Sequence, residues 1–444
     1  MPISPARAAA FDILLRVQQQ DAYVAELLHS NRLDKLSDAD RGLTMEIVMG
    51  VLRWQSRLDS AIAANSSRPI AKLDAQVLIA LRIATYQLQF LSRVPARAAI
   101  NDSVDMVKRA GKTSAAPFAN AVLRKVSDSN VMAPSAAGNS QTVSELAEAY
   151  AHPAWLVERW IKQFGIANTT AICRHDQQVP ATSIRIDDVA VVAELEADGI
   201  TLALGALLTS ARTVVGGDVT QTRAYREGRV FIQDEASQLV AALVGNGSRL
   251  LDCCAAPGSK TAAIAARNPE AEIVAVELHP HRAELLRTRV HATNVQVVTG
   301  DILHFSPQGE FDRVLADVPC SGTGTLARNP EIKWRLKRQD LRDLHAKQVS
   351  ILQAALRQLA PGGRCVYSTC SLEPEENELV IEEAVSNSEN YTVADCRPEL
   401  ERLKEPGELA WSELGELLSG PYLRTLPGVH PCDGFFAAIL QRRS

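Results

Sequence analysis

From Arg249 onward the chain alternates short apolar strands with helices, and this alternation constrains the fold more than any other feature of the sequence. Strand-like pieces such as RLLDC, EIVAVE, VQVV, FDRVLADVP and GGRCVYST are separated by helical stretches, and FFAAIL closes the series. Such alternation predicts a parallel sheet with helices on both faces. Sheets of this kind bind ligands beyond the carboxyl ends of their strands, so functional residues are expected there.

The length of the chain, 444 residues of which 46% are hydrophobic, exceeds that of one compact domain. Residues 1–130 carry amphipathic helical patterns such as LDAQVLIALRIATYQLQFL without strand signals, which predicts an all-α bundle. Residues 131–144 have the Ser, Asn, Pro and Gly content of a linker. Residues 145–235 mix strand-like pieces (TSIRID, RVFIQD) with helical ones and predict a small α/β module. The large α/β domain then spans residues 236–444.

The predicted bundle is the basic part of an acidic chain. Residues 1–130 contain 17 Lys and Arg against 12 Asp and Glu, whereas the rest contains 30 against 40. Clustered cations suit contact with nucleic acid, although each of them could equally belong to a solvated face. The candidates for phosphate contacts are Arg82, Arg93, Arg97, Lys108, Arg109, Lys112, Arg124 and Lys125.

The chain contains neither an apolar run of about 18 residues nor a signal-like start, so we expect a cytoplasmic protein without membrane contact. Its eight cysteines form no CxxC pair and no regular framework. This spacing argues against disulfides and against a structural zinc. It predicts free thiols and no metal site.

Acids are expected at the ends of three successive strands. The first strand ends at Asp252 and leads into the loop CCAAPGSKT, in which Gly258 permits a tight turn before a helix. The loop is not GxGxxG, which disfavours a dinucleotide. Glu277 ends the second strand, where this topology places an acid on a ribose, and Asp301 follows the third. A single such acid could be a solvated carboxylate, but together they predict a nucleoside pocket without a phosphate cradle, which suits S-adenosylmethionine.

Two cysteines fall just past the ends of apolar strands. Cys320 stands in ADVPCSGTG with Asp317 before it, and Cys370 stands in VYSTCSLEPEEN. Free cysteines are usually buried core residues, and that interpretation suits Cys253 and Cys365, which lie inside strand patterns. Cys320 and Cys370 are instead expected at the edge of the sheet where ligands bind.

A methyl donor beside two thiols indicates a particular reaction. Carbon 5 of a pyrimidine is too weak a nucleophile to take a methyl group from a sulfonium, whereas thiolate addition at carbon 6 makes carbon 5 enamine-like. One cysteine would therefore act as a covalent catalyst. A carboxyl such as Asp317, bound to the base edge at N3, would stabilise the adduct. A second cysteine can serve as the base that removes the carbon 5 proton and releases the enzyme.

Four stretches together resemble the RNA 5-methylcytosine methyltransferases of the NOL1/NOP2/Sun group: LLDCCAAPGSKT, ADVPCSGTGTLARNPEIKW, VYSTCSLEPEENE and DGFFAAIL. The N-terminal helices, including ADRGLTMEIVMGVLRW, resemble the NusB-like RNA-binding domain of bacterial members of this group. The resemblance implies a NusB-like bundle, a small α/β module and a Rossmann-like class I methyltransferase domain. It implies S-adenosylmethionine-dependent C5 methylation of a cytosine in 16S ribosomal RNA, free or in an early small-subunit particle. We expect the protein to be a monomer.

The resemblance also implies roles for individual residues. The thiol of the STC motif, Cys370, would be the nucleophile, and Cys320 would take the product-release role. Two residues depart from the family pattern: Ser259 stands where Gly is usual, and Glu277 where Asp is common. The implied donor site consists of Cys254, Ala255, Ala256, Pro257, Gly258, Ser259, Lys260, Glu277, Asp301 and Asp317.

Three stretches allow more than one interpretation. Lys260 would lie near the donor or the target phosphate, or would begin a helix as a solvated charge. The acids of Glu373–Glu383 are expected to favour a helix N-terminus rather than to form a catalytic set. A tryptophan among cations suits a nucleic-acid groove or, equally, a core tryptophan on a charged helix. The residues of this third stretch are Lys333, Trp334, Arg335, Lys337 and Arg338.

Other functions compete with this interpretation. A DNA cytosine C5 methyltransferase shares the chemistry but places its nucleophile in the PC motif, and the STC cysteine and the helical domain argue against it. A non-enzymatic NusB-like RNA-binding scaffold would not bind a methyl donor. A dehydrogenase is disfavoured because GxGxxG is absent.

Overall fold

The computed structural model describes residues 3–20, 22–28, 33–129, 142–386 and 388–444. The chain divides into two compact units, Met1–Val179 with Leu326–Arg335, and Pro180–Thr325 with Leu336–Ser444. The predicted linker lies almost entirely outside the described residues. The predicted domain limits stay a prediction, because compactness alone does not show which stretch folds independently. Across the described residues, none of the helices combines the length and apolar character that a membrane crossing would need.

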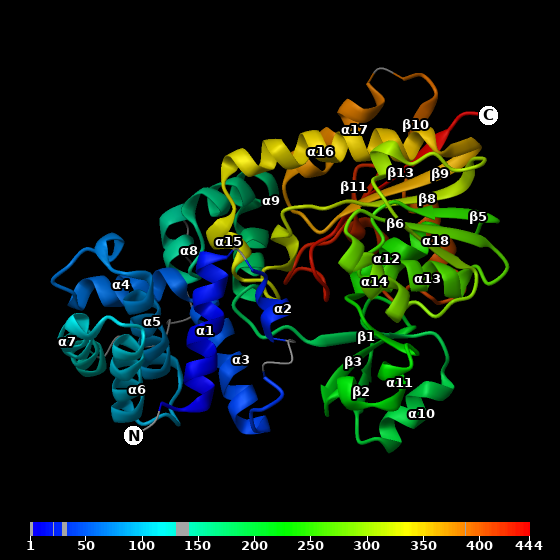
Figure 1. Ribbon diagram of the computed structural model, residues 1–444. Helices are drawn as coiled ribbons and strands as arrows, with labels where there is room; N and C mark the ends of the chain where they lie inside the picture. Colours follow the sequence, from blue (N-terminus) through cyan, green and yellow to red (C-terminus); the bar gives the residue numbers. More distant parts are fainter. Residues whose placement is uncertain (1–2, 21, 29–32, 130–141, 387) are drawn as a thin grey trace. The chain divides into compact units, whose positions relative to one another are not determined.

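The N-terminal part of the first unit is a helical bundle (Figure 1). Its helix α5 (Ala75–Phe90) is buried at every position from Val77 to Gln87. A helix that is buried all round must pack against neighbours on every side. α5 contacts all the other long helices of the bundle, so the bundle is organised around it. These helices are α1 (Pro5–Gln19), α3 (Asp38–Arg53), α4 (Gln55–Asn65), α6 (Ala96–Arg109) and α7 (Ala116–Asp128), and the short α2 (Val24–Leu28) completes the set.

Three further helices belong to the first unit: α8 (Val143–Ala149), α9 (Ala154–His175) and α15 (Ile332–Arg335). α8 begins with a capping box, in which the side chain of Thr142 accepts from the backbone of Glu145 and the Glu145 carboxylate accepts in return. α15 lies in the segment Leu326–Arg335, which leaves the second unit after Thr325 and rejoins it at Leu336. Residues far along the sequence thus complete the first unit.

The second unit begins with a four-stranded antiparallel sheet in the order β2-β3-β1-β4. β1 and β4 are the strands that TSIRID and RVFIQD predicted. β2 and β3 were not identified from the sequence, because β2 is largely exposed and lacks an apolar alternation. The elements are β1 (Thr182–Ile186), α10 (Ala190–Ala197), β2 (Thr201–Leu204), β3 (Ala211–Gly216), α11 (Arg223–Arg226) and β4 (Val230–Ile232).

A larger sheet follows, in the order β11-β12-β13-β9-β8-β5-β6-β7, with β10 paired to β13. The five strands from β9 to β7 are parallel, which confirms the predicted parallel sheet. β13, the predicted strand FFAAIL, is antiparallel to β9. The strands are β5 (Arg249–Asp252), β6 (Glu272–Glu277), β7 (Val295–Thr299), β8 (Phe311–Asp317), β9 (Leu359–Thr369), β10 (Tyr391–Ala394), β11 (Leu418–Ser419), β12 (Tyr422–Arg424) and β13 (Phe436–Arg442).

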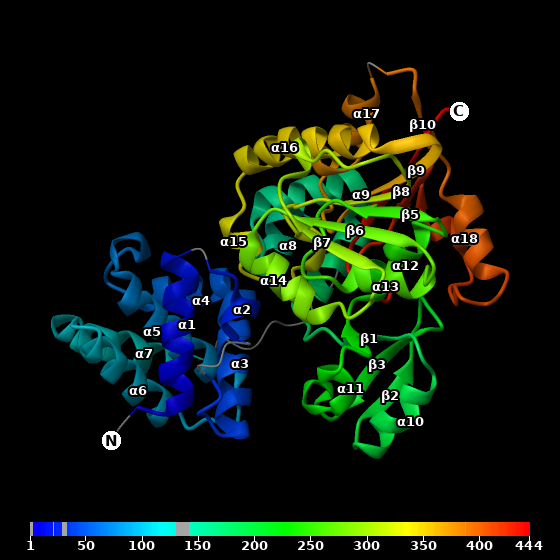
Figure 2. The ribbon, with the colours of Figure 1, turned by 45° about the vertical axis from the view of Figure 1, so that its right-hand side comes forward.

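Helices cover both faces of this sheet (Figures 1 and 2). Successive strand residues such as Leu250 and Leu251 contribute to two separate apolar clusters, one on each face. One cluster includes α12, α13 and α18, and the other includes α16 and α17. The helices are α12 (Glu235–Leu243), α13 (Ser259–Arg267), α14 (Pro280–Arg289), α16 (Arg338–Arg357), α17 (Glu378–Val385) and α18 (Arg397–Lys404).

Candidate active site

The two cysteines predicted to react lie side by side at the carboxyl edge of the larger sheet. Cys320 follows β8 and Cys370 follows β9, which are neighbouring parallel strands. Their Sγ atoms are 3.1 Å apart, and the backbone N–H of Cys370 donates to Sγ of Cys320 at 3.3 Å. Both are partly exposed, whereas Cys253 and Cys365 are buried, as predicted for core cysteines. The fold therefore brings together two thiols that the sequence separates by 50 residues.

The surroundings of the two thiols differ in charge. The hydrogen bond to Cys370, burial and the nearby carboxylate of Glu376 raise the pKa of Cys320 well above its usual value. Cys370 instead interacts electrostatically with the ammonium of Lys260. The site therefore favours a proton on Cys320 and places a cation beside Cys370.

Lys260 is held inside the site by Asp317. Its Nζ donates to Oδ2 of Asp317 at 2.8 Å and lies 5.1 Å from the ring centroid of Phe435. The second carboxylate oxygen of Asp317 accepts from Oγ of Ser368 at 2.7 Å. Although burial disfavours the ammonium, the Asp317 carboxylate raises the pKa of Lys260 above its ordinary value. The interpretation of Lys260 as a solvated charge is therefore wrong.

The loop predicted to hold the methyl donor joins β5 to α13. Gly258 has a φ of +107°, and a Cβ there would lie 2.6 Å from a methyl group of Leu286 on α14, so the position requires glycine. The carbonyl of Ser259 accepts from Nη1 of Arg185 at 2.7 Å. The loop thus packs closely against α14 at Gly258 and is hydrogen-bonded to Arg185 at Ser259. It consists of the predicted residues Cys254, Ala255, Ala256, Pro257, Gly258, Ser259 and Lys260.

The two acids predicted to meet the donor lie at neighbouring strand ends. Glu277 is buried, and its carboxylate accepts from the backbone N–H groups of His279 at 2.9 Å and Ala256 at 3.3 Å. The N–H of Gly300 donates to the carbonyl of Glu277 at 2.9 Å, which places Asp301 beside it. A Cβ at Gly300 would meet no atom within 4 Å. The space next to this strand end is therefore open.

These residues fit S-adenosylmethionine. Carboxylates at two adjacent strand ends offer acceptors for ribose hydroxyls, and the open space beside Gly300 admits a group against the strands. The third predicted acid, Asp252, serves the loop itself: it is buried and accepts from Oγ1 of Thr261 at 2.7 Å. Burial raises the pKa of Asp252 to about 7.

Arg185 on β1 supports the donor loop but was not identified from the sequence. It is buried, and besides Ser259 it donates to Oε1 of Gln233 at 2.9 Å. Its guanidinium carbon lies 4.5 Å from the ring centroid of Phe231. The available signal was a charge between two isoleucines in TSIRID, but only the folded chain shows that the charge reaches a loop 74 residues away.

The tryptophan among cations packs into the first unit. Lys333 is 1% exposed, and its Nζ donates to the carbonyl of Arg53 at 3.0 Å. The indole N–H of Trp334 donates to the carbonyl of Leu52 at 2.6 Å. Both partners lie at the C-terminal end of α3, so these side chains close the helix end. The nucleic-acid interpretation is wrong for Lys333, which is a core residue, whereas Trp334 is half-buried and both of its interpretations stay predictions.

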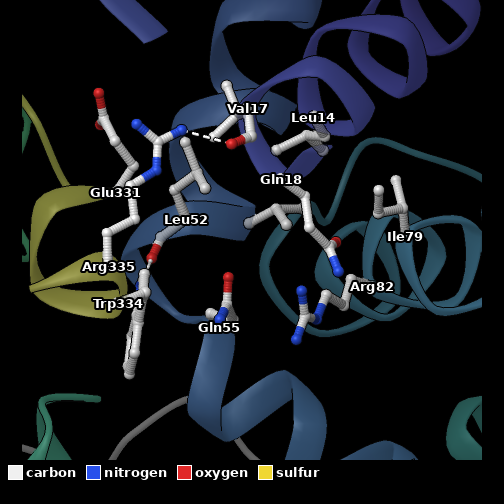
Figure 3. Close-up of a pocket in the computed structure, with 11 residues that line it drawn as sticks. Leu14, Val17, Gln18, Leu52, Gln55, Ile79, Arg82, Glu331, Trp334 and Arg335 are labelled. Carbon is white, nitrogen blue, oxygen red and sulfur yellow. Dashed lines mark hydrogen bonds between the residues drawn. The ribbon is translucent and has the colours of Figure 1, made fainter. Parts of the chain in front are cut away.

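The same segment lines a cavity of about 220 Å³ in the first unit (Figure 3). Arg335 donates to the carbonyls of Val17 and, at 2.8 Å, Ala22. Across the cavity the guanidinium of Arg82 is bound by both carboxylate oxygens of Asp59, at 2.7 Å each. Arg82 is therefore a buried, paired charge, and its interpretation as a phosphate contact is wrong.

Comparison with known proteins identifies all three parts of the chain. Residues 241–441 match the family model for 16S rRNA methyltransferase RsmB/F, and residues 4–128 match the NusB family. Residues 152–214 match the ferredoxin-like domain of RsmF/B-like methyltransferases. These matches confirm the predicted NusB-like bundle and Rossmann-like methyltransferase domain, and they show that the small α/β module is ferredoxin-like.

Curated relatives match over nearly the full length. The "Probable ribosomal RNA small subunit methyltransferase B" of Bacillus subtilis is 31% identical, over 98% of each chain. The ribosomal RNA small subunit methyltransferase B of Vibrio cholerae is 30% identical, over 98% of this chain and 97% of the relative.

Solved structures share the fold. The crystal structure of PH0851 aligns over 100% of both chains with a TM-score of 0.79 and 24% identity. NSun6 from Pyrococcus horikoshii, solved with SFG, covers 66% of this chain and 98% of its own with a TM-score of 0.55 and 18% identity. The chain therefore belongs to the 16S rRNA methyltransferase RsmB/F family and is an S-adenosylmethionine-dependent methyltransferase of ribosomal RNA with an N-terminal NusB domain.

Proposed function

We propose that this protein methylates carbon 5 of a cytosine in 16S ribosomal RNA through a covalent bond between Cys370 and carbon 6 of the base. The observation that carries the proposal is the pair of thiols, with Sγ atoms 3.1 Å apart, at the edge of the sheet that also carries the donor loop. A single thiol would suit nucleophilic attack, but two adjacent thiols suit attack and subsequent release.

In this proposal Cys370 makes the bond to the base. The thiolate form of Cys370 adds to carbon 6 and moves electron density to carbon 5, and the ammonium of Lys260 interacts electrostatically with this sulfur. Asp317 lies at the end of the neighbouring strand, where its carboxylate stabilises the adduct through the N3 edge of the base. S-adenosylmethionine supplies the methyl group as an electrophile on a positively charged sulfur. The base must leave its stack to reach these groups.

Cys320 then removes the proton from carbon 5. The hydrogen bond with Cys370 is the largest cause that raises the pKa of Cys320 above its usual value. Once the sulfur of Cys370 is bonded to carbon, the partly exposed Cys320 gives its own proton to solvent water and becomes the thiolate that acts as the base. Transfer of the carbon 5 proton to Cys320 allows the bond between carbon 6 and Cys370 to break, which regenerates the thiolate and frees the methylated base.

The helical domain would hold the RNA. Arg97 and Arg124 line a groove of about 400 Å³ with the amides of Asn101 and Asn120. Guanidinium and amide donors in one groove suit phosphate and sugar oxygens. We propose 16S RNA, free or in an early small-subunit particle, as the substrate, and a cytoplasmic monomer as the active form.

The test combines product analysis with an adduct gel. The wild-type protein is incubated with S-adenosylmethionine and a 16S transcript, and the RNA is digested and analysed by mass spectrometry for 5-methylcytidine. Cys320→Ala and Cys370→Ala are run on a denaturing gel after the same incubation. We expect an RNA adduct with Cys320→Ala, because release fails, and none with Cys370→Ala.

Each other outcome contradicts a specific part of the proposal. An adduct with Cys370→Ala alone would make Cys320 the nucleophile, as in DNA cytosine methyltransferases. Methyl transfer to another base or another atom would exclude C5 chemistry. Neither adduct nor methyl transfer, on both the free transcript and small-subunit particles, would favour a non-enzymatic scaffold.

A further inference from the structure

A buried carboxylate next to the two thiols takes no part in the steps above. Glu376 is 0% exposed and ends the short 3-10 helix η6 (Pro374–Glu376). The sequence placed this acid among those favouring a helix start. Glu376 does lie in the first turn of a helix, but its carboxylate is directed into the protein and accepts hydrogen bonds from four donor groups.

Glu376 fixes the backbone on both sides of Cys320. Its Oε1 accepts from the N–H of Ser321 at 2.7 Å and from Nε2 of Gln348 at 2.9 Å. The same Nε2 donates to the carbonyl of Pro319 at 2.9 Å. Ser321, after Cys320, is thus bound directly to the Glu376 carboxylate. Pro319, before Cys320, is connected to the same carboxylate through Gln348.

The second oxygen of this carboxylate reaches the loop of Cys370. Oε2 accepts from the hydroxyls of Ser321 and Ser371, which lie 3.0 Å from each other. The next residue, Asn377, completes the support: its Oδ1 accepts from Oγ1 of Thr369 at 2.6 Å, and its Nδ2 donates to the carbonyl of Ser371 at 2.9 Å. Both neighbours of Cys370 are therefore held by two consecutive residues, one of which also holds Cys320.

We propose that Glu376 is a positioning residue that holds the sulfur atoms of Cys320 and Cys370 side by side. The inference rests on the proposed function, in which the two sulfurs act on adjacent carbons of one base. A displacement of a reacting group by about 1 Å can lower the rate on the order of 100-fold, so both attack and release require the two sulfur atoms to stay in fixed positions. A carboxylate suits this position because it accepts only, and its four partners can all donate.

Disulfide formation measures the separation of the sulfurs without RNA. Oxidised glutathione converts the two thiols into a disulfide: each thiol loses one proton and one electron, and the oxidant is reduced to two glutathione thiols. Peptide mass mapping then gives the rate for the Cys320–Cys370 bond. We expect fast formation in the wild-type protein, at least a tenfold slower rate in Glu376→Ala, and recovery in Glu376→Gln, whose amide can accept from Ser321 N–H and donate to the hydroxyls. The exposed Glu382→Gln on α17 is the matched control.

The methylation kinetics complete the test. Glu376→Ala is expected to lower kcat about 100-fold while the KM values for RNA and methyl donor stay within twofold. If this variant does not fold, Ser371→Ala removes the hydroxyl that joins the Cys370 loop to Glu376, together with its contacts to Ser321, Thr323 and the N–H of Glu373, and is expected to slow disulfide formation in the same direction. Equal disulfide rates in the wild type and the variants, or no disulfide in the wild type, would overturn the positioning role. Absence of 5-methylcytidine with the wild type would instead overturn the proposed function, whatever the disulfide rates.

Discussion

The Sγ atoms of Cys320 and Cys370 lie 3.1 Å apart at the ends of two neighbouring parallel strands. This relationship follows from the strand order, since β8 and β9 are adjacent in the sheet and both end at the same edge. The loops that follow β8 and β9 are also hydrogen-bonded to each other, because the N–H of Gly324 donates to the carbonyl of Cys370 at 2.9 Å. The two thiols therefore form one structural unit at this edge of the sheet.

Asp317→Asn is expected to lower kcat/KM for methylation by about 100-fold to 1000-fold, the range observed when one preorganised group at a reaction centre is removed. The substitution removes the carboxylate that we propose to stabilise the adduct, and it removes the partner of Lys260. Single-turnover methylation gives the rate. Asp312→Asn, near the other end of the same strand, is the control and should affect stability rather than rate, because the Asp312 carboxylate accepts from the backbone and hydroxyl of Ser248 and from the backbone of Arg249. Equal rates for both variants would contradict a role of Asp317 in the reaction.

The stability of the protein should depend on the buried Asp252. Its pKa is about 7 in the folded protein, against about 4 for an ordinary Asp side chain, so the unfolded chain ionises first. The contribution of protonated Asp252 to the free energy of unfolding is therefore fully present below pH 4 and is lost as the pH rises to 7. Asp252→Asn should abolish this part of the pH dependence, worth up to about 4 kcal/mol. Urea unfolding at several pH values measures it, with the exposed Glu270→Gln as control; parallel curves for the wild type and Asp252→Asn would refute the prediction.

The buried Lys333 should give a pH dependence of the opposite direction. Burial lowers its pKa to about 7, whereas an ordinary Lys titrates near 10.4. The unfolded chain binds the proton more strongly, so stability falls as the pH decreases from 10 to 7. Lys333→Met should therefore stabilise the protein at pH 6. The gain is up to about 5 kcal/mol, reduced by what the lost hydrogen bond to Arg53 contributed, and it should shrink towards pH 9. The exposed Lys337→Met should show no such trend in the same unfolding experiment.

Gly324→Ala should disturb the loop that follows Cys320. A Cβ there would lie 2.1 Å from the carbonyl oxygen of Gly434, whose N–H donates to the carbonyl of Gly324 at 2.8 Å. Because the atoms of Gly434 that meet the new Cβ are backbone atoms, the clash can be relieved only by a shift of the loop. We therefore expect a loss of about 1–3 kcal/mol in the free energy of unfolding and slower adduct formation. Gly415→Ala meets no atom within 4 Å and is the control. Unchanged thermal unfolding and adduct rates for Gly324→Ala would show that the loop adapts freely.

The helical bundle and the parallel sheet were both predictable from local patterns. Amphipathic helices without strand signals indicated the bundle, and alternating strands and helices indicated the sheet with its ligand edge. The position of Cys320 and Cys370 past strand ends followed from the same patterns, because the end of an apolar run marks the edge of a parallel sheet.

Other features depended on contacts between distant residues. Lys333 looked as suitable for an RNA groove as for a core, and only its burial and its hydrogen bond to the end of α3 decided between the two. Arg185 and Glu376 are charges that each have partners far along the chain, Ser259 and Ser321, and these partners could not be inferred from a local pattern. The sequence by itself determined the fold class and the position of the two thiols and of the loop after β5 at one sheet edge, because periodicity and strand ends are local properties of the chain. Only the tertiary structure decided which charges are buried and paired. Burial and hydrogen bonding depend on which distant segments come into contact, and these contacts are set by the strand order of the sheet and by the segment Leu326–Arg335, which belongs to the first unit.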